Sequence, residues 1–443
     1  MNIVIAGAGQ VGTHLAKMLS NGDHNITLLD EDNEKLKPLQ AFDLMTMKGS
    51  PVSIINLKDT NIKHCDLFIA VTPHETENIT ACILAKDLGA KETVARIDNN
   101  GYVLPENIER FKRFGVDSLI YPEMLAAKEI VQALSMPGIR QLHEFEDNRL
   151  LLVGIKMKEG APILNIPISM LDLNKKGMHI MSINRNYETF IPNGDDEIRA
   201  GDIVLYITER DNLATVRKEN GRPYFDVKNI MILGGSRIGI KTAQMSLDNY
   251  NIKIIEKDKD RCIKLAEKVN NALIINVDGG NIEDLKEEGL AKMDAFIALT
   301  DNSETNILSC ILAKRLGIKK TVAEIENLDY FSLAENFGVG TIINKKQIAA
   351  SHIYELTLKG KVSHVKCLTA TDGQILEFVT KPGAKITKKP LNEISLPEGV
   401  NIGVIIRNDE IIIAQGWLTI NPNDKVVLFS LSHNFKKIEK LFG

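Results

Sequence analysis

The chain has 443 residues, of which 44 % are hydrophobic and 25 % are charged. This length exceeds one ordinary domain, and the composition is that of a folded globular protein with roughly two to four domains. The net charge of −4 argues against nucleic acid as a partner, and no apolar run reaches the roughly 20 residues of a transmembrane helix.

The cysteines indicate a reducing compartment. The five of them are far apart and form no CxxC pair, which argues against a disulfide framework and against a zinc site. No cluster of His, Cys or carboxylates has metal-ligand spacing, and no nucleophile elbow is present. We therefore expect a cytoplasmic protein with no metal site and no catalytic residues, in which Cys82 and Cys310 are core residues.

The first segment, residues 1–136, has the pattern of a Rossmann nucleotide-binding domain. Short runs rich in Ile and Val alternate with segments of helical period, which predicts a doubly wound parallel sheet. The expected strands are 2–6, 25–29, 43–47, 66–71, 93–97 and 117–120. A further helix is expected over 122–136, because Pro137 and Gly138 follow it and would end it.

The sequence pattern changes after that helix. Residues 140–217 contain short alternating runs separated by turn signals such as Pro192-Asn193-Gly194-Asp195. This pattern predicts a small β-rich lobe. The segment 219–225, ENGRPYF, is the best candidate for a linker to the rest of the chain.

The remainder of the chain repeats this order. Residues 65–99 and 293–327 are identical at 20 of 35 positions without a gap, so one unit has been duplicated. The repeat predicts a second Rossmann domain over 228–358 and a second β-rich lobe over 362–443. Its expected strands are 229–233, 252–256, 272–276, 294–299, 320–325 and 340–343, and a helix is expected over 345–360. The fold class is therefore α/β, with two tandem Rossmann-like doubly wound parallel sheets, each followed by a small β-rich α+β lobe.

A glycine-rich turn in the first copy predicts a nucleotide site. Gly7, Gly9 and Gly12 follow an apolar strand and open a helix, and the next strand ends in Asp30. The first glycine permits the tight turn, the second lets phosphates approach, and the third lets helix and strand pack closely. The helix N-terminus would bind the phosphates, and the carboxylate of Asp30 would accept hydrogen bonds from ribose hydroxyls. That carboxylate would repel a 2′-phosphate, which favours NAD(H) over NADP(H). The alternative is a glycine turn that binds nothing.

Other candidates follow the carboxyl ends of the expected strands, where such sheets bind ligands. They are Thr72 and Pro73 after the fourth strand, Gly49 and Ser50 after the third, and Arg96 at the end of the fifth. The guanidinium of Arg96 would neutralise pyrophosphate charge. A surface salt bridge is an equally good interpretation of Arg96.

The second copy departs from this pattern. Ser236 replaces the second glycine, and Glu324 replaces Arg96. Glu256 keeps the ribose carboxylate, and Arg237 beside the turn would compensate in part. We therefore expect a weaker or different ligand in the second copy.

Several segments of the first copy resemble a known protein family. The segments IAGAGQVG, LLDEDNEKL, FIAVTPHETENITACILAKDLGA and VARIDN resemble the regulator-of-potassium-conductance (RCK) modules. The tandem arrangement with two C-terminal lobes resembles the TrkA family, the peripheral regulatory subunits of bacterial Trk potassium uptake systems. The resemblance covers nearly the whole chain.

The resemblance implies a function and a ligand set. It implies NAD(H), with ADP or ATP as alternatives, on the Rossmann sites. It also implies a homotetramer docked on the inner face of the cell membrane, gating an integral-membrane potassium-transporting subunit of the TrkH type. The implied first-copy ligand residues are Gly7, Ala8, Gly9, Gln10, Val11, Gly12, Asp30, Thr72, Pro73 and Arg96. The implied second-copy residues are Gly234, Gly235, Ser236, Arg237, Ile238 and Glu256. Helices 122–136 and 345–358 are candidates for contacts between modules.

Two other functions remain open on the residues alone. An NAD-dependent dehydrogenase would share the cofactor fold, but it needs a proton-transfer group near the nicotinamide. The lobes offer only the isolated His143 and His364, which we interpret as surface or packing residues. A nucleotide sensor with a partner unrelated to transport is the third possibility, because the sequence does not reveal a docking surface.

Overall fold

The computed structural model describes residues 1–20, 24–146, 148–186, 188–358, 362, 364–368, 373–431 and 434–442. They divide into two compact units. The first unit combines Met1–Leu125 with Lys345–Lys361, and the second combines Ala126–Asn344 with Val362–Gly443. None of the helices in these described ranges is long and apolar enough to cross a membrane.

The first unit is built on a six-stranded parallel sheet in the order β3-β2-β1-β4-β5-β6, the doubly wound order of a Rossmann fold. Its strands are β1 Asn2–Ala6, β2 Asn25–Asp30, β3 Met45–Lys48, β4 Leu67–Ala70, β5 Glu92–Arg96 and β6 Ser118–Ile120. Its helices are α1 Gln10–Ser20, α2 Asn33–Leu36, α3 Ile54–Asp59, α4 Glu75–Asp87 and α5 Pro105–Arg113. The central strand β4, LFIA, is buried throughout, as expected for a parallel sheet covered by helices on both faces.

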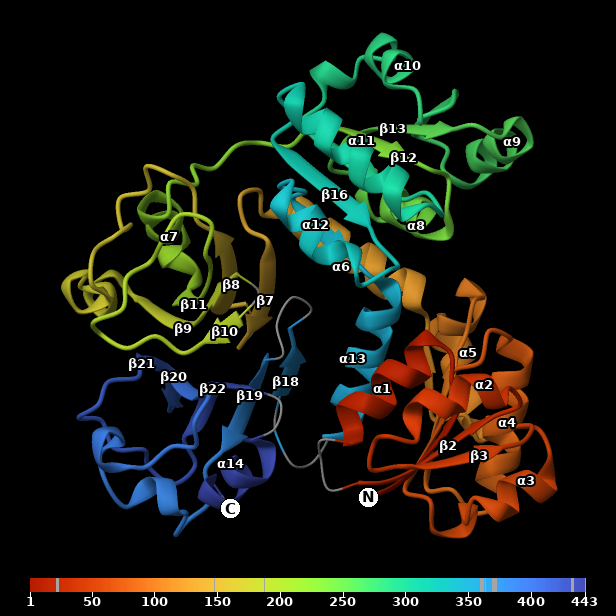
Figure 1. Cartoon of the computed structure of the whole chain (residues 1–443), viewed down its shortest axis with the longest axis horizontal. Helices are drawn as coiled ribbons and strands as arrows, with labels where there is room; N and C mark the ends of the chain where they lie inside the picture. Colours follow the sequence, from red (N-terminus) through yellow and green to blue (C-terminus); the bar gives the residue numbers. More distant parts are fainter. Residues whose placement is uncertain are drawn as a thin grey trace. The chain divides into compact units, whose positions relative to one another are not determined.

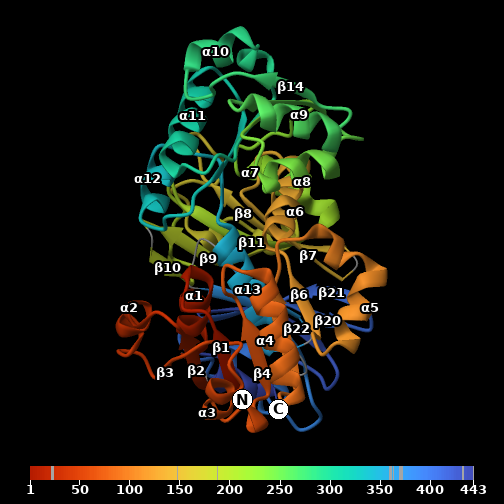
Figure 2. The ribbon, with the colours of Figure 1, turned by 90° about the vertical axis from the view of Figure 1, so that its right-hand side faces the viewer.

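A helix from the second half of the chain completes this unit. Helix α13, Lys345–Thr357, follows the second sheet in sequence but packs against α1 of the first (Figures 1 and 2). Its counterpart α6, Pro122–Ser135, follows the first sheet, and its residues from Ala126 onward belong to the second unit. The expected helix over 345–360 ends at Thr357 as α-helix, and positions 359 and 360 lie outside the described residues.

The second unit contains the second Rossmann sheet, in the order β14-β13-β12-β15-β16-β17. Its strands are β12 Asn229–Leu233, β13 Asn251–Glu256, β14 Leu273–Asn276, β15 Ala295–Ala298, β16 Lys320–Glu324 and β17 Thr341–Ile343. Its helices are α8 Arg237–Ser246, α9 Lys259–Lys268, α10 Ile282–Glu287, α11 Ser303–Arg315 and α12 Tyr330–Asn336. The order matches that of the first sheet strand for strand, which confirms the duplicated α/β fold.

Two five-stranded sheets form the predicted β-rich lobes, in the orders β10-β9-β11-β8-β7 and β18-β19-β22-β20-β21. The first lobe consists of β7 Gln141–Phe145, β8 Leu150–Lys156, β9 Met178–Arg185, β10 Glu188–Phe190, β11 Ile203–Glu209 and helix α7 Leu213–Glu219. The second consists of β18 His364–Cys367, β19 Gly373–Val379, β20 Val400–Arg407, β21 Glu410–Ile413, β22 Lys425–Leu431 and helix α14 Phe435–Phe442. In each lobe an equivalent ion pair links a partly exposed arginine to a buried aspartate, Arg185 with Asp202 and Arg407 with Asp424, both at 2.7 Å.

The two lobes share one hydrophobic core. Leu152, Met181 and Ile207 of the first lobe pack with Val404 and Phe429 of the second in a single buried cluster. Strand β9 lies against β20 and β22 in this contact, as Figure 1 shows for the olive and blue sheets. The lobes of one chain therefore form a sandwich of two sheets.

Candidate functional site

The first glycine turn joins β1 to α1, and its backbone geometry excludes side chains at two positions. Gly7 has φ +109°, and its N–H donates to the carbonyl of Leu29 at 2.8 Å. A Cβ on Gly12 would lie 1.9 Å from the carbonyl oxygen of Gly7, so helix and strand pack with no room for one. The tight turn and the close helix–strand packing that the motif requires are both present.

Space remains open beside the middle glycine. A Cβ placed on Gly9 would meet nothing within 4 Å. Helix α1 begins at the next residue, Gln10, and the first N–H groups of a helix have no partner within the helix. The open space therefore faces donors that suit a phosphate oxygen, at the positive end of the helix dipole.

The carboxylate of Asp30 lies against this turn. Its Oδ2 accepts the N–H of Ala8 at 2.6 Å, and its Oδ1 accepts that of Asp32 at 2.8 Å. The side chain is partly exposed, because Asp30 ends β2 at the carboxyl edge of the sheet. The N–H of Gly49 donates to the backbone carbonyl of Asp30, which places Gly49 and Ser50 on the adjoining strand end.

Thr72 and Arg96 are brought together on the other side of the turn. A guanidinium N–H of Arg96 donates to the carbonyl of Thr72 at 3.2 Å. Thr72 is buried and Pro73 beside it is exposed. Gly7 lies next to this strand end, since a Cβ on Gly7 would meet the N of Thr72 at 3.0 Å. The structure thus places Thr72 and Arg96 at the same edge as the glycine turn.

Arg96 forms the salt bridge that was one of the two interpretations of its sequence position. Its Nη2 lies 3.4 Å from a carboxylate oxygen of Asp98, so the expected salt bridge is present. Its Nε is buried and has no hydrogen-bond partner in the part of the chain that the structure describes. A buried donor without a partner is costly, and an anionic group bound at this edge would satisfy it.

Asn78 holds this arrangement and was not singled out from the sequence. Its amide nitrogen donates to the carbonyls of Thr72 and Arg96, and its oxygen accepts the N–H of Thr72. Asn306 makes the same three bonds in the second copy, with Thr300 and Glu324. The sequence signal for this role was an asparagine kept at the same position in both copies.

The second glycine turn has the same backbone but a different N-terminus on its helix. Gly234 has φ +100°, and its N–H donates to Ile255. Ser236 stands where the first copy has Gly9, and its Oγ accepts the N–H of Gly239 as the N-cap of α8. A side-chain oxygen therefore occupies a donor that a phosphate would use. Ile238 is buried, and Arg237 is exposed at the first position of α8.

The carboxylate of the second site is covered. Glu256 is 5 % exposed and accepts the N–H groups of Gly235 and Asp258 at 2.9 and 3.0 Å. A Cβ on Gly235 would lie 2.3 Å from Cδ1 of Leu265, so that side chain packs directly over the turn. The guanidinium of Arg261 lies 4.0 Å from Glu256. Glu324, at the position of Arg96, is 4 % exposed and places a carboxyl group where the first copy has a cation.

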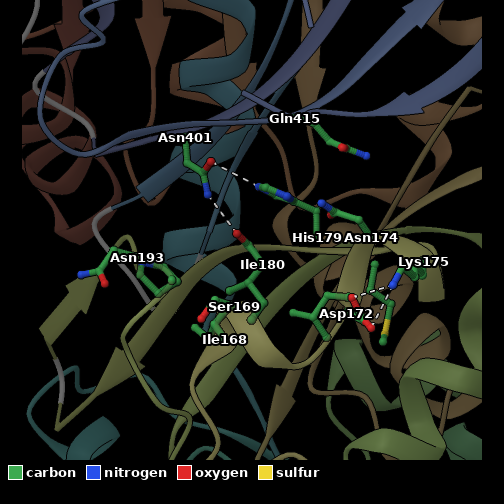
Figure 3. A pocket seen from close by; sticks show the side chains of 14 residues that line it. Ile168, Ser169, Asp172, Asn174, Lys175, His179, Ile180, Asn193, Asn401 and Gln415 are labelled. Atoms are coloured by element: carbon green, nitrogen blue, oxygen red, sulfur yellow. Dashed lines mark hydrogen bonds and ion pairs between the residues drawn. The ribbon is translucent and has the colours of Figure 1, made fainter. Parts of the chain in front are cut away.

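A separate pocket of about 680 Å³ lies between the two β-rich lobes (Figure 3). His179 on β9 and Asn401 on β20 meet at 3.3 Å within it, and the amide of Asn401 also donates to the carbonyl of Ile180. Burial lowers the pKa of the His179 imidazole below its ordinary value. His179 and Asn401 occupy equivalent positions on β9 and β20. Because these two strands contact each other, the pair lies where the two sheets meet.

The remaining sequence expectations concern single residues. Cys82 and Cys310 are fully buried core residues, as predicted, and burial raises the pKa of both thiols. His143 packs its ring against Phe145, while the side chain of His364 lies outside the described residues. Among the described residues, no three His, Cys, Asp or Glu side chains gather in a way that would hold a metal ion.

Family models match both halves of the chain. The TrkA-N domain model matches residues 3–122 and 230–345. The TrkA-C domain model matches residues 152–221 and 375–443. The matched segments follow the two Rossmann sheets and the two β-rich lobes in chain order.

Similar proteins align over the full length. The Trk system potassium uptake protein TrkA of Haemophilus influenzae is 33 % identical over 452 residues, covering 100 % of this chain and 98 % of that protein. A TrkA homologue of Methanosarcina mazei is 30 % identical and covers 100 % of both chains. Among solved structures, the GsuK RCK domain has a TM-score of 0.61 at 15 % identity, covering 100 % of this chain and 94 % of that one. The GsuK channel bound to NAD has a TM-score of 0.62 at 15 % identity, covering 100 % and 78 %.

Proposed function

The chain belongs to the TrkA family of Trk system potassium uptake proteins, and from that membership we propose that it is a regulatory subunit of a potassium uptake system. In this proposal it binds NAD(H) or an adenine nucleotide at the first glycine turn. Binding there gates an integral-membrane potassium-transporting subunit of the TrkH type, to which the protein docks from the cytoplasm as a homotetramer.

The observation that supports nucleotide binding most strongly is the open first turn. Free space beside Gly9, the carboxylate of Asp30 and the partnerless Nε of Arg96 all lie at the carboxyl edge of one sheet. The phosphates would lie on the N-terminus of α1, and Asp30 would exchange its bond to Ala8 for the ribose hydroxyls. The 2′-phosphate of NADP(H) would lie against the carboxylate of Asp30, and the two negative charges would repel each other. The site therefore favours NAD(H), ADP or ATP over NADP(H).

The solved structures of similar fold agree with this choice of ligand. One of them is a GsuK channel bound to NAD, and another is GsuK bound to ADP. In the second copy of this chain, Ser236, Leu265 and the buried Glu256 oppose the same ligand. We therefore propose one strong site per chain, formed by Gly7, Ala8, Gly9, Gln10, Val11, Gly12, Asp30, Thr72, Pro73 and Arg96.

Regulation requires that the ligand favours one arrangement of the protein over another. Helix α13 connects the halves physically, because it leaves the second sheet and packs on α1, the helix that begins at the glycine turn. A ligand that shifts α1 therefore acts on a segment attached to the second half. A coupling of about 1–3 kcal/mol between nucleotide binding and gating would change transport roughly 5- to 150-fold.

The test compares equivalent carboxylates in the two copies. Asp30→Ala removes the ribose acceptor of the first site, and Glu256→Ala removes its counterpart in the second. We expect Asp30→Ala to weaken NADH and ADP binding by about tenfold or more, since a hydrogen bond to a charged group contributes about 1.5–3 kcal/mol. Glu256→Ala should leave the measured affinity unchanged.

The readouts are isothermal titration calorimetry and nucleotide-dependent potassium uptake by membranes that contain the transporting subunit. Equal loss in both variants, or none in either, would contradict the assignment of one strong site. Steady hydride turnover by the purified chain with small alcohols or acids would replace the regulatory proposal with that of a dehydrogenase.

A further inference from the structure

A second pocket lies within the second unit, between the first β-rich lobe and the second Rossmann sheet. Its volume is about 260 Å³, which suits a small ligand rather than a whole dinucleotide. The start of β16, at Lys320, and the loop before β17, from Gly338 to Gly340, form one wall. Since the glycine turn lies at the carboxyl ends of the strands, this pocket is at the opposite edge of the sheet.

The pocket is lined by a concentration of positive charge. The first lobe and its flanking segments contribute Arg140, Lys156, Lys158 and Arg222, and the Rossmann domain contributes Lys314, Lys319 and Lys320. No Asp or Glu is among the described residues that line it. The nearest carboxylate in the ion pairs of this region is Glu335, which lies 3.4 Å from Arg140.

Lys320 is the most buried of these cations. It is 5 % exposed, and its Nζ donates to the carbonyl of Ile139 at 3.2 Å and to Oγ1 of Thr341 at 3.1 Å. Both acceptors are neutral. Burial and the charge of Arg140 lower the pKa of the Lys320 ammonium to about 7. A buried ammonium without a carboxylate partner is costly, and a bound anion would remove that cost.

The neighbouring cations repel one another as well. Burial lowers the pKa of Lys156, and the charges of Arg140 and Arg222 lower it further. The pKa of Lys314 is likewise lowered by burial and by the surrounding cations. The repulsion is therefore shared by side chains from the lobe and from the Rossmann domain, and it opposes the Arg140–Glu335 ion pair and the bond from Lys156 Nζ to the carbonyl of Glu335 that join the two.

The first copy neutralises the same edge with its own carboxylates. Asp117 accepts Lys86 Nζ and the N–H of Thr93, both at 2.8 Å. In the second copy Gly340 stands at the position of Asp117, and a Cβ there would lie 2.4 Å from the carbonyl oxygen of Thr321. Glu92, which begins β5, is replaced by Lys320. At these positions the second copy thus has two fewer carboxylates and one more cation than the first.

We propose that this pocket is an anion site for a phosphorylated small molecule or inorganic pyrophosphate, held between the first lobe and the second Rossmann domain. Compact, multiply charged phosphoryl groups match a cluster of lysine and arginine donors. The threonine hydroxyl of Thr341 at the pocket wall is a further donor. Occupancy would join the lobe to the sheet, so this ligand would stiffen the second unit independently of any nucleotide at the first glycine turn.

The experiment titrates pyrophosphate into the full chain at low ionic strength by calorimetry. Lys156→Gln, inside the pocket, should weaken binding about tenfold, and Lys319→Gln, at its exposed rim, about threefold. The control is Lys91→Gln, which removes the same charge at the position in the first copy equivalent to Lys319. Its affinity for pyrophosphate should match that of the unchanged chain.

Two further readouts separate a binding role from a structural one. Without ligand, Lys156→Gln should melt no earlier than the unchanged chain, because removing a like charge relieves repulsion. At pH 8, binding should take up protons, since an anion surrounded by Arg140, Lys156, Lys158, Arg222, Lys314 and Lys319, with Glu335 nearby, would raise the pKa of Lys320. This uptake is measured as a dependence of the binding heat on the buffer.

Either of two results would overturn the proposal. The first is no heat and no thermal shift with millimolar pyrophosphate. The second is equal affinity in Lys156→Gln, Lys319→Gln and the unchanged chain, which would place pyrophosphate at a glycine turn instead. Because the pocket and the glycine turns are separate, failure here would leave nucleotide binding at Asp30 untouched.

Discussion

The two glycine turns share a backbone and differ in what surrounds it. In both, a carboxylate at the end of the second strand accepts an N–H of the turn, from Ala8 in one copy and Gly235 in the other. Around the first, the space beside Gly9 is open. At the second, Leu265 packs against Gly235, the counterpart of Ala8, and Ser236, the counterpart of Gly9, caps the helix. The backbone role of the motif is therefore kept in both copies, and we propose that ligand access differs between them.

The two sheets also differ at the edge where the amino ends of their strands lie. Here the second copy has the pocket that suits an anion. The first copy closes its edge with the Asp117–Lys86 pair, whereas in the second the residues that line the pocket around Lys320 include no carboxylate, and Glu335 pairs with Arg140 beside it. We therefore propose that each copy binds an anion at one edge of its sheet, the first at the carboxyl ends of its strands and the second at the amino ends.

The largest effect is expected from the third glycine of each turn. Gly12→Ala would place a Cβ 1.9 Å from the Gly7 carbonyl oxygen, whereas Gly239→Ala would place one 2.6 Å from that of Gly234. We expect Gly12→Ala to lower the free energy of unfolding by about 3 kcal/mol, the upper end for overpacking, and Gly239→Ala by less. Urea denaturation followed by circular dichroism measures both, and equal losses would show that the turns are packed alike.

The next effect concerns the residues at the end of the fifth strand. Arg96→Leu should weaken NADH binding about tenfold, because the variant lacks the buried donor that we assign to the ligand. Arg96→Lys should retain part of the affinity, since it keeps a positive charge. Glu324→Leu, the matched change in the second copy, should leave NADH binding as it was. Calorimetric titration distinguishes these outcomes, and a loss in Glu324→Leu would indicate a functional second site.

The lobes provide a test by pH. Burial holds the pKa of His179 below its ordinary value of 6.5, so the unfolded chain takes up a proton before the folded one does. Stability should fall as the pH drops below about 6.5, by at most about 1.4 kcal/mol per pH unit, and should be unaffected by this group above it. His179→Asn, which gives both lobes the residue found at Asn401, should remove this dependence. A slope unchanged in that variant would assign it to other groups.

The smallest effects are expected from exchanging the middle residues of the two turns. Gly9→Ser should fold normally because its Cβ meets nothing within 4 Å, yet it should weaken NADH binding several-fold by occupying the phosphate space. Ser236→Gly should cost only a few tenths of a kcal/mol, as expected for replacing a serine N-cap with glycine. It should not create a second NADH site, because Leu265 still covers the turn. Appearance of such a site would show that Ser236 alone blocks it.

Much of the fold could be predicted from local patterns. The strands around Ile5, Leu28 and Phe68 read as short apolar runs, because both faces of a parallel sheet are buried and alternation is lost. The glycines of the first turn were recognisable from their spacing, because the tight turn and the close helix packing each require glycine at a fixed position. Asn78 was missed, since only the match with Asn306 in the other copy marks it, and its neighbours along the chain do not reveal its bonds to Thr72 and Arg96.

The sequence by itself determined the duplication, the doubly wound parallel sheet of each copy and the position of the first glycine turn, because these depend on periodicity and on neighbours along the chain. Only the tertiary structure decided that α13 packs on α1, that the two lobes share one core, and that Leu265 covers the second turn. It alone gathered Arg140, Lys156 and Lys320 into one pocket. The physical reason is that burial and charge proximity arise from contacts between segments far apart in the chain, which no local pattern encodes.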